Sequence, residues 1–114
     1  MKFTIAPQFT IGARKFRIVF NDFLLAKMRD DASANMLEQI VRLPYKGSAS
    51  GIKVTPEAQF ELLLHEIEHT INVILGINAS ERDCTSRATL LAQALISLGL
   101  EPDFSQITEE KRVE

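Results

Sequence analysis

A sharply delimited helix in the middle of the chain constrains its fold most. Thr55 is a suitable N-cap, and Pro56 occupies the first helical position, where its missing N–H costs nothing. Gly76 is a typical C-terminal stop. These signals predict a helix over about residues 56–75. An apolar stripe along one of its faces would pack on the rest of the domain.

A second helix follows after a short connection. Ser80 can cap its first turn, and Gly99 can end it, so we expect a helix over about residues 80–98. Its main buried stripe is expected to contain small and aliphatic residues, namely Cys84, Ala88, Leu91, Leu95 and Leu98. We expect the two helices to form one layer of the fold.

The first third of the chain is β-rich. RKFRIVFND alternates, with Phe16, Ile18 and Phe20 on one face, and the earlier runs KFTIA and FTIGA are short and β-prone. MLEQIVRL, residues 36–43, alternates again, with Leu37, Val41 and Leu43 on one face. The sequence therefore predicts an α+β fold in which a small twisted sheet packs on a two-helix layer.

Length and composition indicate one soluble domain. The chain has 114 residues and a net charge of −2, which gives no reason to expect nucleic acid or an anionic membrane as partner. No run approaches the roughly 20 apolar residues of a membrane span, and the single cysteine excludes an internal disulfide. We expect a cytoplasmic protein with one domain over residues 1–107 and a charged, frayed tail over residues 108–114.

Both histidines of the chain lie in one five-residue stretch, His65-Glu66-Ile67-Glu68-His69. Residues four apart on a helix lie about 40° apart around its axis, so His65 and His69 project from one face and can bind one ion. Glu66 lies on the adjoining flank, where it can take a proton from a metal-bound water. The spacing predicts a zinc site with a catalytic carboxylate, although histidines on a helix are often merely structural.

The third metal ligand has several candidates, because a catalytic zinc requires three protein ligands. Glu81 lies at the edge of the buried stripe of the second helix, and an acid in a first turn is also favourable on dipole grounds alone. Cys84 can ligate as a thiolate but suits an apolar core position, and Asp83 points away from that stripe. Glu81 is our predicted third ligand, with Asp83, Cys84, a water or a partner as alternatives.

The motif and its surroundings resemble a known group of proteins. LLHEIEHTINVILG followed by ERDCTSRATLLAQAL resembles the small HExxH metallopeptidase-like proteins of phages and prophages, which are similar to SprT-like and ImmA/IrrE-type zincins. KFRIVFND and MLEQIVRL resemble the early strand and the edge strand of that group. The resemblance covers residues 9–98, but only the HExxH motif in it is sharply specific.

The resemblance implies a minimal, gluzincin-like fold and a peptidase that binds one Zn²⁺ per chain. His65 and His69 would be zinc ligands, Glu66 the general base, and strand 36–43 the edge beside which an extended peptide would lie. The group has a glutamate early in its second helix, where this chain has Thr85. Two further functions therefore stay open: a weakly active or inactive zincin-like module that binds a protein, and a purely structural scaffold.

Overall fold

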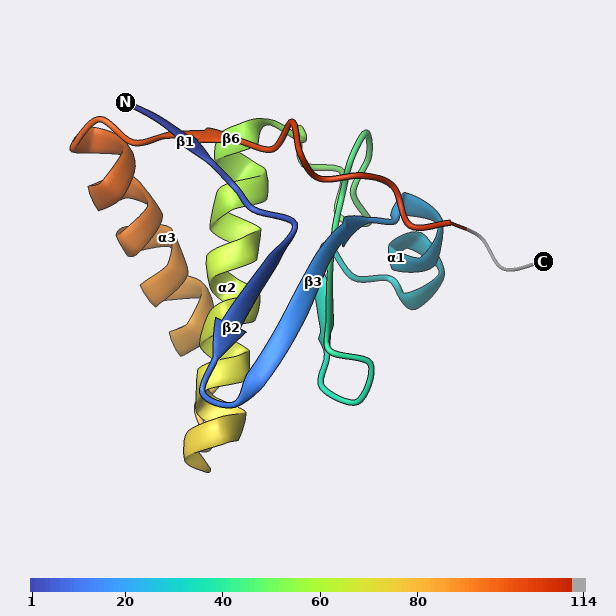
Figure 1. Ribbon diagram of the computed structural model, residues 1–114, viewed down its shortest axis with the longest axis vertical. Helices are drawn as coiled ribbons and strands as arrows, with labels where there is room; N and C mark the ends of the chain where they lie inside the picture. The colour runs from blue at the N-terminus through green and yellow to red at the C-terminus, as the bar shows by residue number, and fades with distance from the viewer. Residues whose placement is uncertain (112–114) are drawn as a thin grey trace.

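The computed structural model describes residues 1–111 and contains three helices and six strands among them (Figure 1). The strands are β1 (Lys2–Thr4), β2 (Gln8–Ile11), β3 (Arg14–Phe20), β4 (Ser33–Asn35), β5 (Ile40–Leu43) and β6 (Glu101–Asp103), and the helices are α1 (Asp22–Met28), α2 (Pro56–Leu75) and α3 (Glu81–Ser97). The fold is a compact α+β fold, as predicted. No helix within residues 1–111 has the length and apolarity needed to cross a membrane.

The main sheet is mixed and has the order β2-β3-β5-β4. β2 and β3 form an antiparallel hairpin, β3 and β5 are parallel, and β5 and β4 are antiparallel. A separate parallel pair joins β1 to β6, which brings the N-terminal strand beside the segment that follows α3 (Figure 1). α1 forms the crossover from β3 toward β4 and packs near β5.

The core lies between this sheet and α2. The predicted face of β3 is confirmed, because Phe16, Ile18 and Phe20 are all buried. Phe60 and Leu63 of α2 pack against them in one hydrophobic cluster. α3 lies beside α2 on the side away from β3, so α2 is covered by two layers (Figure 1). Because the sheet covers one side of α2 and α3 covers another, only the remaining face of α2 is accessible to a ligand.

Both long helices begin and end as predicted. The Thr55 side chain accepts a hydrogen bond from the N–H of Ala58, and Gly76 ends α2 with φ 69°, a left-handed conformation that favours glycine. Ser80 caps α3 in the same way as Thr55 caps α2.

The buried stripe of α3 differs from the prediction in its second half. It continues from Cys84 and Ala88 to Ala92, whereas Leu91 is 45% exposed and Leu98 is 83% exposed. Small residues face α2 because the two helices approach closely there.

The prediction of an edge strand over residues 36–43 is wrong. Only Ile40–Leu43 forms a strand, β5, and it is an inner strand with β3 on one side and β4 on the other. All four residues of β5 are buried, while Leu37, predicted to share their face, is 96% exposed in the preceding turn. The edge of the sheet beyond β5 is instead β4, in the segment DASAN, whose small polar residues gave no strand signal.

The expectation of a frayed tail from residue 108 is wrong for its first residues. The Phe20 N–H donates to the Thr108 carbonyl, and the Glu110 N–H donates to the Phe20 carbonyl, so the tail forms a parallel β-bridge to the last residue of β3. The Glu110 carboxylate accepts from Arg42 Nε at 2.8 Å and from Asn21 Nδ2 at 2.8 Å. Residues 112–114 of the predicted tail lie outside the described residues.

Candidate metal centre

Three side chains from the two long helices converge at one point. His65 Nε2 lies 2.6 Å from Glu81 Oε1, and His69 Nε2 lies 2.8 Å from Glu81 Oε2. The two Nε2 atoms are 2.9 Å apart. The i, i+4 spacing aligns the two rings on α2, and the first turn of α3 brings the carboxylate to them. His65, His69 and Glu81 therefore form a cluster that can hold a metal ion.

The donor set and its spacing fit a small divalent cation. Tetrahedral zinc with bonds of about 2.0–2.1 Å places its ligand atoms roughly 3.3 Å from one another. The observed separations of 2.6–2.9 Å are about 0.4–0.7 Å shorter than this, so each atom of a pair need move outward by less than about 0.4 Å. Two imidazoles and one carboxylate also leave one tetrahedral position open, as catalytic zinc sites do.

The far ring nitrogens of both histidines have partners on α3. His65 Nδ1 lies 3.3 Å from Thr85 Oγ1, and His69 Nδ1 lies 3.6 Å from Cys84 Sγ. Asn72 Nδ2 in turn donates to that sulfur at 3.3 Å. Contacts at Nδ1 orient the rings and leave Nε2 for the ion, because a histidine ligand donates its other N–H to a neighbouring acceptor.

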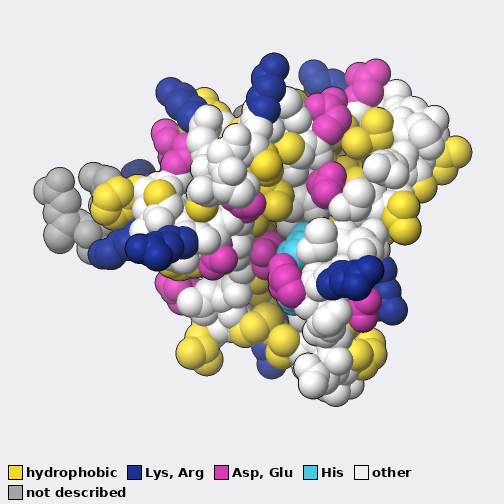
Figure 2. All heavy atoms as spheres, turned by 180° about the vertical axis from the view of Figure 1, so that it is seen from behind, with side chains coloured by type: hydrophobic (Ala, Val, Ile, Leu, Met, Phe, Trp, Pro, Cys, Tyr) yellow, Lys and Arg dark blue, Asp and Glu magenta, His cyan; other side chains and the backbone are white. Residues whose placement is uncertain are grey.

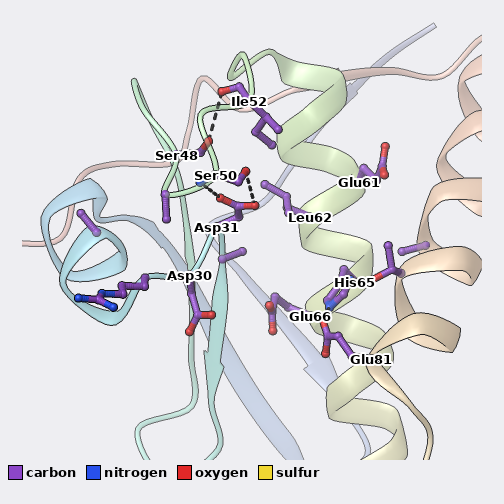
Figure 3. Close-up of a pocket in the computed structure, with 16 residues that line it drawn as sticks. Asp30, Asp31, Ser48, Ser50, Ile52, Glu61, Leu62, His65, Glu66 and Glu81 are labelled. Atoms are coloured by element: carbon purple, nitrogen blue, oxygen red, sulfur yellow. Dashed lines mark hydrogen bonds and ion pairs between the residues drawn. The ribbon is translucent and has the colours of Figure 1, made fainter.

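Glu66 lies beside the cluster but does not belong to it. Only 7% of the residue is exposed, and its carboxylate points into the cleft beside His65 and Glu81 (Figure 3). Burial raises the pKa of Glu66 to about 7, and the carboxylates of Glu81 and Asp30 add to the shift. A cation bound to the histidines would lower the pKa of Glu66 and favour its ionised form.

The cluster opens into a cleft with two connected parts. The larger part has a volume of about 840 Å³ and lies between α2, α3 and the loop after β5. The smaller part, about 340 Å³, lies between α2 and β4. Asp30, Ala32, Glu66 and Glu81 line both parts. In Figure 2 a histidine side chain is visible at the floor of this hollow, with acidic side chains around it.

The predicted site residues are brought together as the sequence indicated. His65, His69 and Glu81 meet, and Glu66 lies beside them, whereas Asp83 is exposed and lies outside the cluster. Cys84 is buried 3.6 Å from His69 Nδ1, whereas Glu81 contacts His69 Nε2, so the thiol lies outside the cluster of His65, His69 and Glu81.

Sequence reasoning missed two residues of the site. Asp30, which faces Glu66 across the cleft, comes from the loop after α1, more than thirty residues away (Figure 3). The sequence showed Thr85 only as the residue that replaces the glutamate ligand of the related group, and its contact with His65 through the hydroxyl was not predicted. Glu81 and Thr85 are four residues apart on α3 and so lie on the same face, and this spacing was the one signal in the sequence that could have placed Thr85 at the site.

The chain matches no protein-family model, no curated protein and no solved structure. The interpretation of the cleft therefore depends on its own residues and geometry.

Proposed function

We propose that this protein is a zinc-dependent peptidase with a minimal, zincin-like site. His65, His69 and Glu81 would hold one Zn²⁺, and Glu66 would be the general base. The observation that carries the proposal is the convergence of both Nε2 atoms on the Glu81 carboxylate with a buried carboxylate beside them. Glu66 is largely buried and its carboxylate makes no hydrogen bond to residues 1–111, and burial raises its pKa, as is common for acids with a chemical role.

The chemistry follows from where each group lies. When bound, Zn²⁺ supplies a Lewis acid that polarises the peptide carbonyl and lowers the pKa of the attacking water. Glu66 accepts a proton from that water while the water oxygen attacks the carbonyl carbon. The C–N bond then breaks, and Glu66 returns the proton to the leaving amine nitrogen. Thr85 and Cys84 hold the two imidazoles in orientation throughout.

The substrate backbone would lie along β4. This strand is at the edge of the sheet, and its residues Ser33 and Ala34 line the smaller part of the cleft together with His69 and Glu66. An extended peptide can add to a free strand edge through main-chain hydrogen bonds. The strand that we propose for peptide binding is therefore β4, the edge strand next to β5, and not the strand over residues 36–43 that the resemblance implied.

A cleavage assay tests the proposal. Zinc-loaded protein is incubated with a mixture of unstructured peptides, and the products are identified by mass spectrometry, beside the Glu66→Gln variant. We expect cleavage by the native protein and none by the variant, with equal zinc content in both. Equal cleavage by the two proteins would refute the role of Glu66, and no cleavage by zinc-loaded native protein would refute the peptidase proposal.

A further inference from the structure

The walls of the larger part of the cleft carry an unbalanced negative charge. Within residues 1–111, five acidic residues line it, Asp30, Asp31, Glu61, Glu66 and Glu81, against one arginine, Arg29, and no lysine. Acidic side chains also surround the histidine that is visible in the space-filling view (Figure 2). A bound divalent cation would offset the charges of Glu66 and Glu81. Asp30, Asp31 and Glu61 would then still outnumber Arg29, so the cleft stays acidic with its metal bound.

The three remaining acids differ in how they are held. Asp31 accepts hydrogen bonds from the Ser50 N–H at 2.9 Å and the Ser50 hydroxyl at 2.7 Å, which fixes the loop that forms one wall (Figure 3). Glu61 accepts from Thr89 Oγ1 at 2.6 Å on the opposite wall. Asp30 makes no side-chain hydrogen bond or ion pair within residues 1–111, and its carboxylate faces Glu66 across the cleft (Figure 3).

The charge alone does not define a ligand site, but two other features point to one. Glu66 is more than nine-tenths buried, has no side-chain hydrogen bond to the described residues, and is directed into the cleft (Figure 3). The cleft also borders the free edge of β4, which can take an extended chain. A ligand that lies along that edge passes between Asp30 and Glu66 into the acidic part.

We infer that the cleft selects peptides that carry lysine or arginine side chains, with Asp30 and Glu61 as specificity-determining residues of the larger part. This inference rests on the proposed function, because it specifies the substrate class of the same site. Complementary charges favour the correct partner, and an acidic side chain at the same place would be repelled by three carboxylates. Asp31 contributes charge too, but it also holds the wall loop, so it is the poorer choice for mutation.

Peptide binding tests the inference separately from catalysis. The probes are two fluorescein-labelled octapeptides that are identical except that one has two lysines where the other has two glutamates. Anisotropy is measured at low salt with zinc-loaded Glu66→Gln protein, which cannot cleave them. We expect the lysine peptide to bind about tenfold more tightly, and the preference to weaken as salt is raised.

Neutral, isosteric variants then locate the source of the preference. Asp30→Asn combined with Glu61→Gln, in the Glu66→Gln protein, should reduce the preference to about twofold. The control is Glu101→Gln in the same background, which removes an exposed acid of β6 outside the cleft and should leave the preference unchanged.

Each outcome is decisive for the inference. Equal binding of the two peptides, or failure of both to bind, overturns it, and so does an equal loss of preference in the control variant. Cleavage of peptides by the native protein without any preference for lysine would overturn the inference but leave the proposed function standing. A lysine preference in a protein that cleaves nothing would support the inference and overturn the peptidase.

Discussion

Glu81 should be required for the stabilisation of the protein by zinc, although not for its folding. The Glu81 side chain is 70% exposed, so its replacement by glutamine should change the stability of the metal-free protein by less than about 1 kcal/mol. A neutral amide is a much poorer metal ligand than a carboxylate. Changes to groups that merely support a ligand lower metal affinity about 10–100-fold, so loss of Glu81 should cost at least about 100-fold.

The difference in zinc affinity can be measured as a difference in the zinc-induced shift of the melting temperature. Zinc at 100 times its Kd stabilises a folded protein by about 2.7 kcal/mol, whereas the same concentration with a Kd 100-fold weaker gives about 0.4 kcal/mol. Unfolding entropy of about 2.1 cal/mol/K per residue over the 114 residues of the chain makes these shifts about 11 °C and about 2 °C. Thermal unfolding of metal-stripped protein, with and without zinc, measures them. Asp83→Asn is the matched control, because this exposed acid of α3 lies outside the cluster.

The reasoning would be refuted if Glu81→Gln kept the full zinc-induced shift, since the carboxylate would then not be a ligand. A loss of the shift in Asp83→Asn would be an equally clear contradiction.

Three further changes test other parts of the structure. Thr85→Val removes the partner of the His65 ring and should weaken zinc binding about 10–100-fold by competition titration, with little change in metal-free stability; an unaltered affinity would contradict its orienting role. Glu110→Gln should cost about 1–2 kcal/mol of unfolding free energy at pH 7 because it removes the shorter of the two ion pairs of the buried Arg42 and leaves it only the pair with the exposed Glu38. Hydrogen bonds from Arg42 lower the pKa of Glu110 below its usual 4.5, so this contribution is present above that pH and is lost as the pH falls through the lowered value; in denaturation curves the native protein and the variant should therefore differ less at pH 3 than at pH 7. Ala92→Leu should destabilise the protein by about 1–3 kcal/mol by forcing α3 away from α2, while Leu98→Ala, at an exposed position, should have almost no effect; similar values for the two would argue against the observed stripe.

The sequence predicted the two long helices, α2 and α3, well because their signals are local. Thr55, Ser80 and Gly76 act on the backbone within a few residues, so caps and stops can be recognised without knowledge of the fold. The order of the strands in the sheet could not be predicted in this way. Whether Ile40–Leu43 is an inner or an edge strand depends on Ser33–Asn35, a segment with no strand propensity of its own that pairs only because β5 is there.

The contacts of the C-terminal segment were also beyond local reasoning. Glu110 lies in a charged run that is typical of a frayed end, yet it pairs with Arg42, sixty-eight residues earlier. Nothing in the run itself identifies that partner, because the ion pair exists only after β3 and β5 have formed and left Arg42 almost fully buried.

The candidate site was predictable to the extent that it lies on helices. The fixed geometry of α2 places His65 and His69 on one face, and the short connection to α3 restricts the third ligand to the first turn of that helix. The choice between Glu81 and Cys84 depended on the rotation of α3 about its axis, which the packing of Ala88 and Ala92 against α2 determines. Asp30 could not be foreseen, since it comes from a loop whose position depends on the whole sheet.

The measurement that tests the central claim most directly is the metal content of protein purified without added zinc, beside the His65→Ala variant. The account predicts about one zinc per chain in the native protein and almost none in the variant, because His65 provides one of three converging ligands. Native protein that holds no metal, even after zinc has been offered, would contradict it.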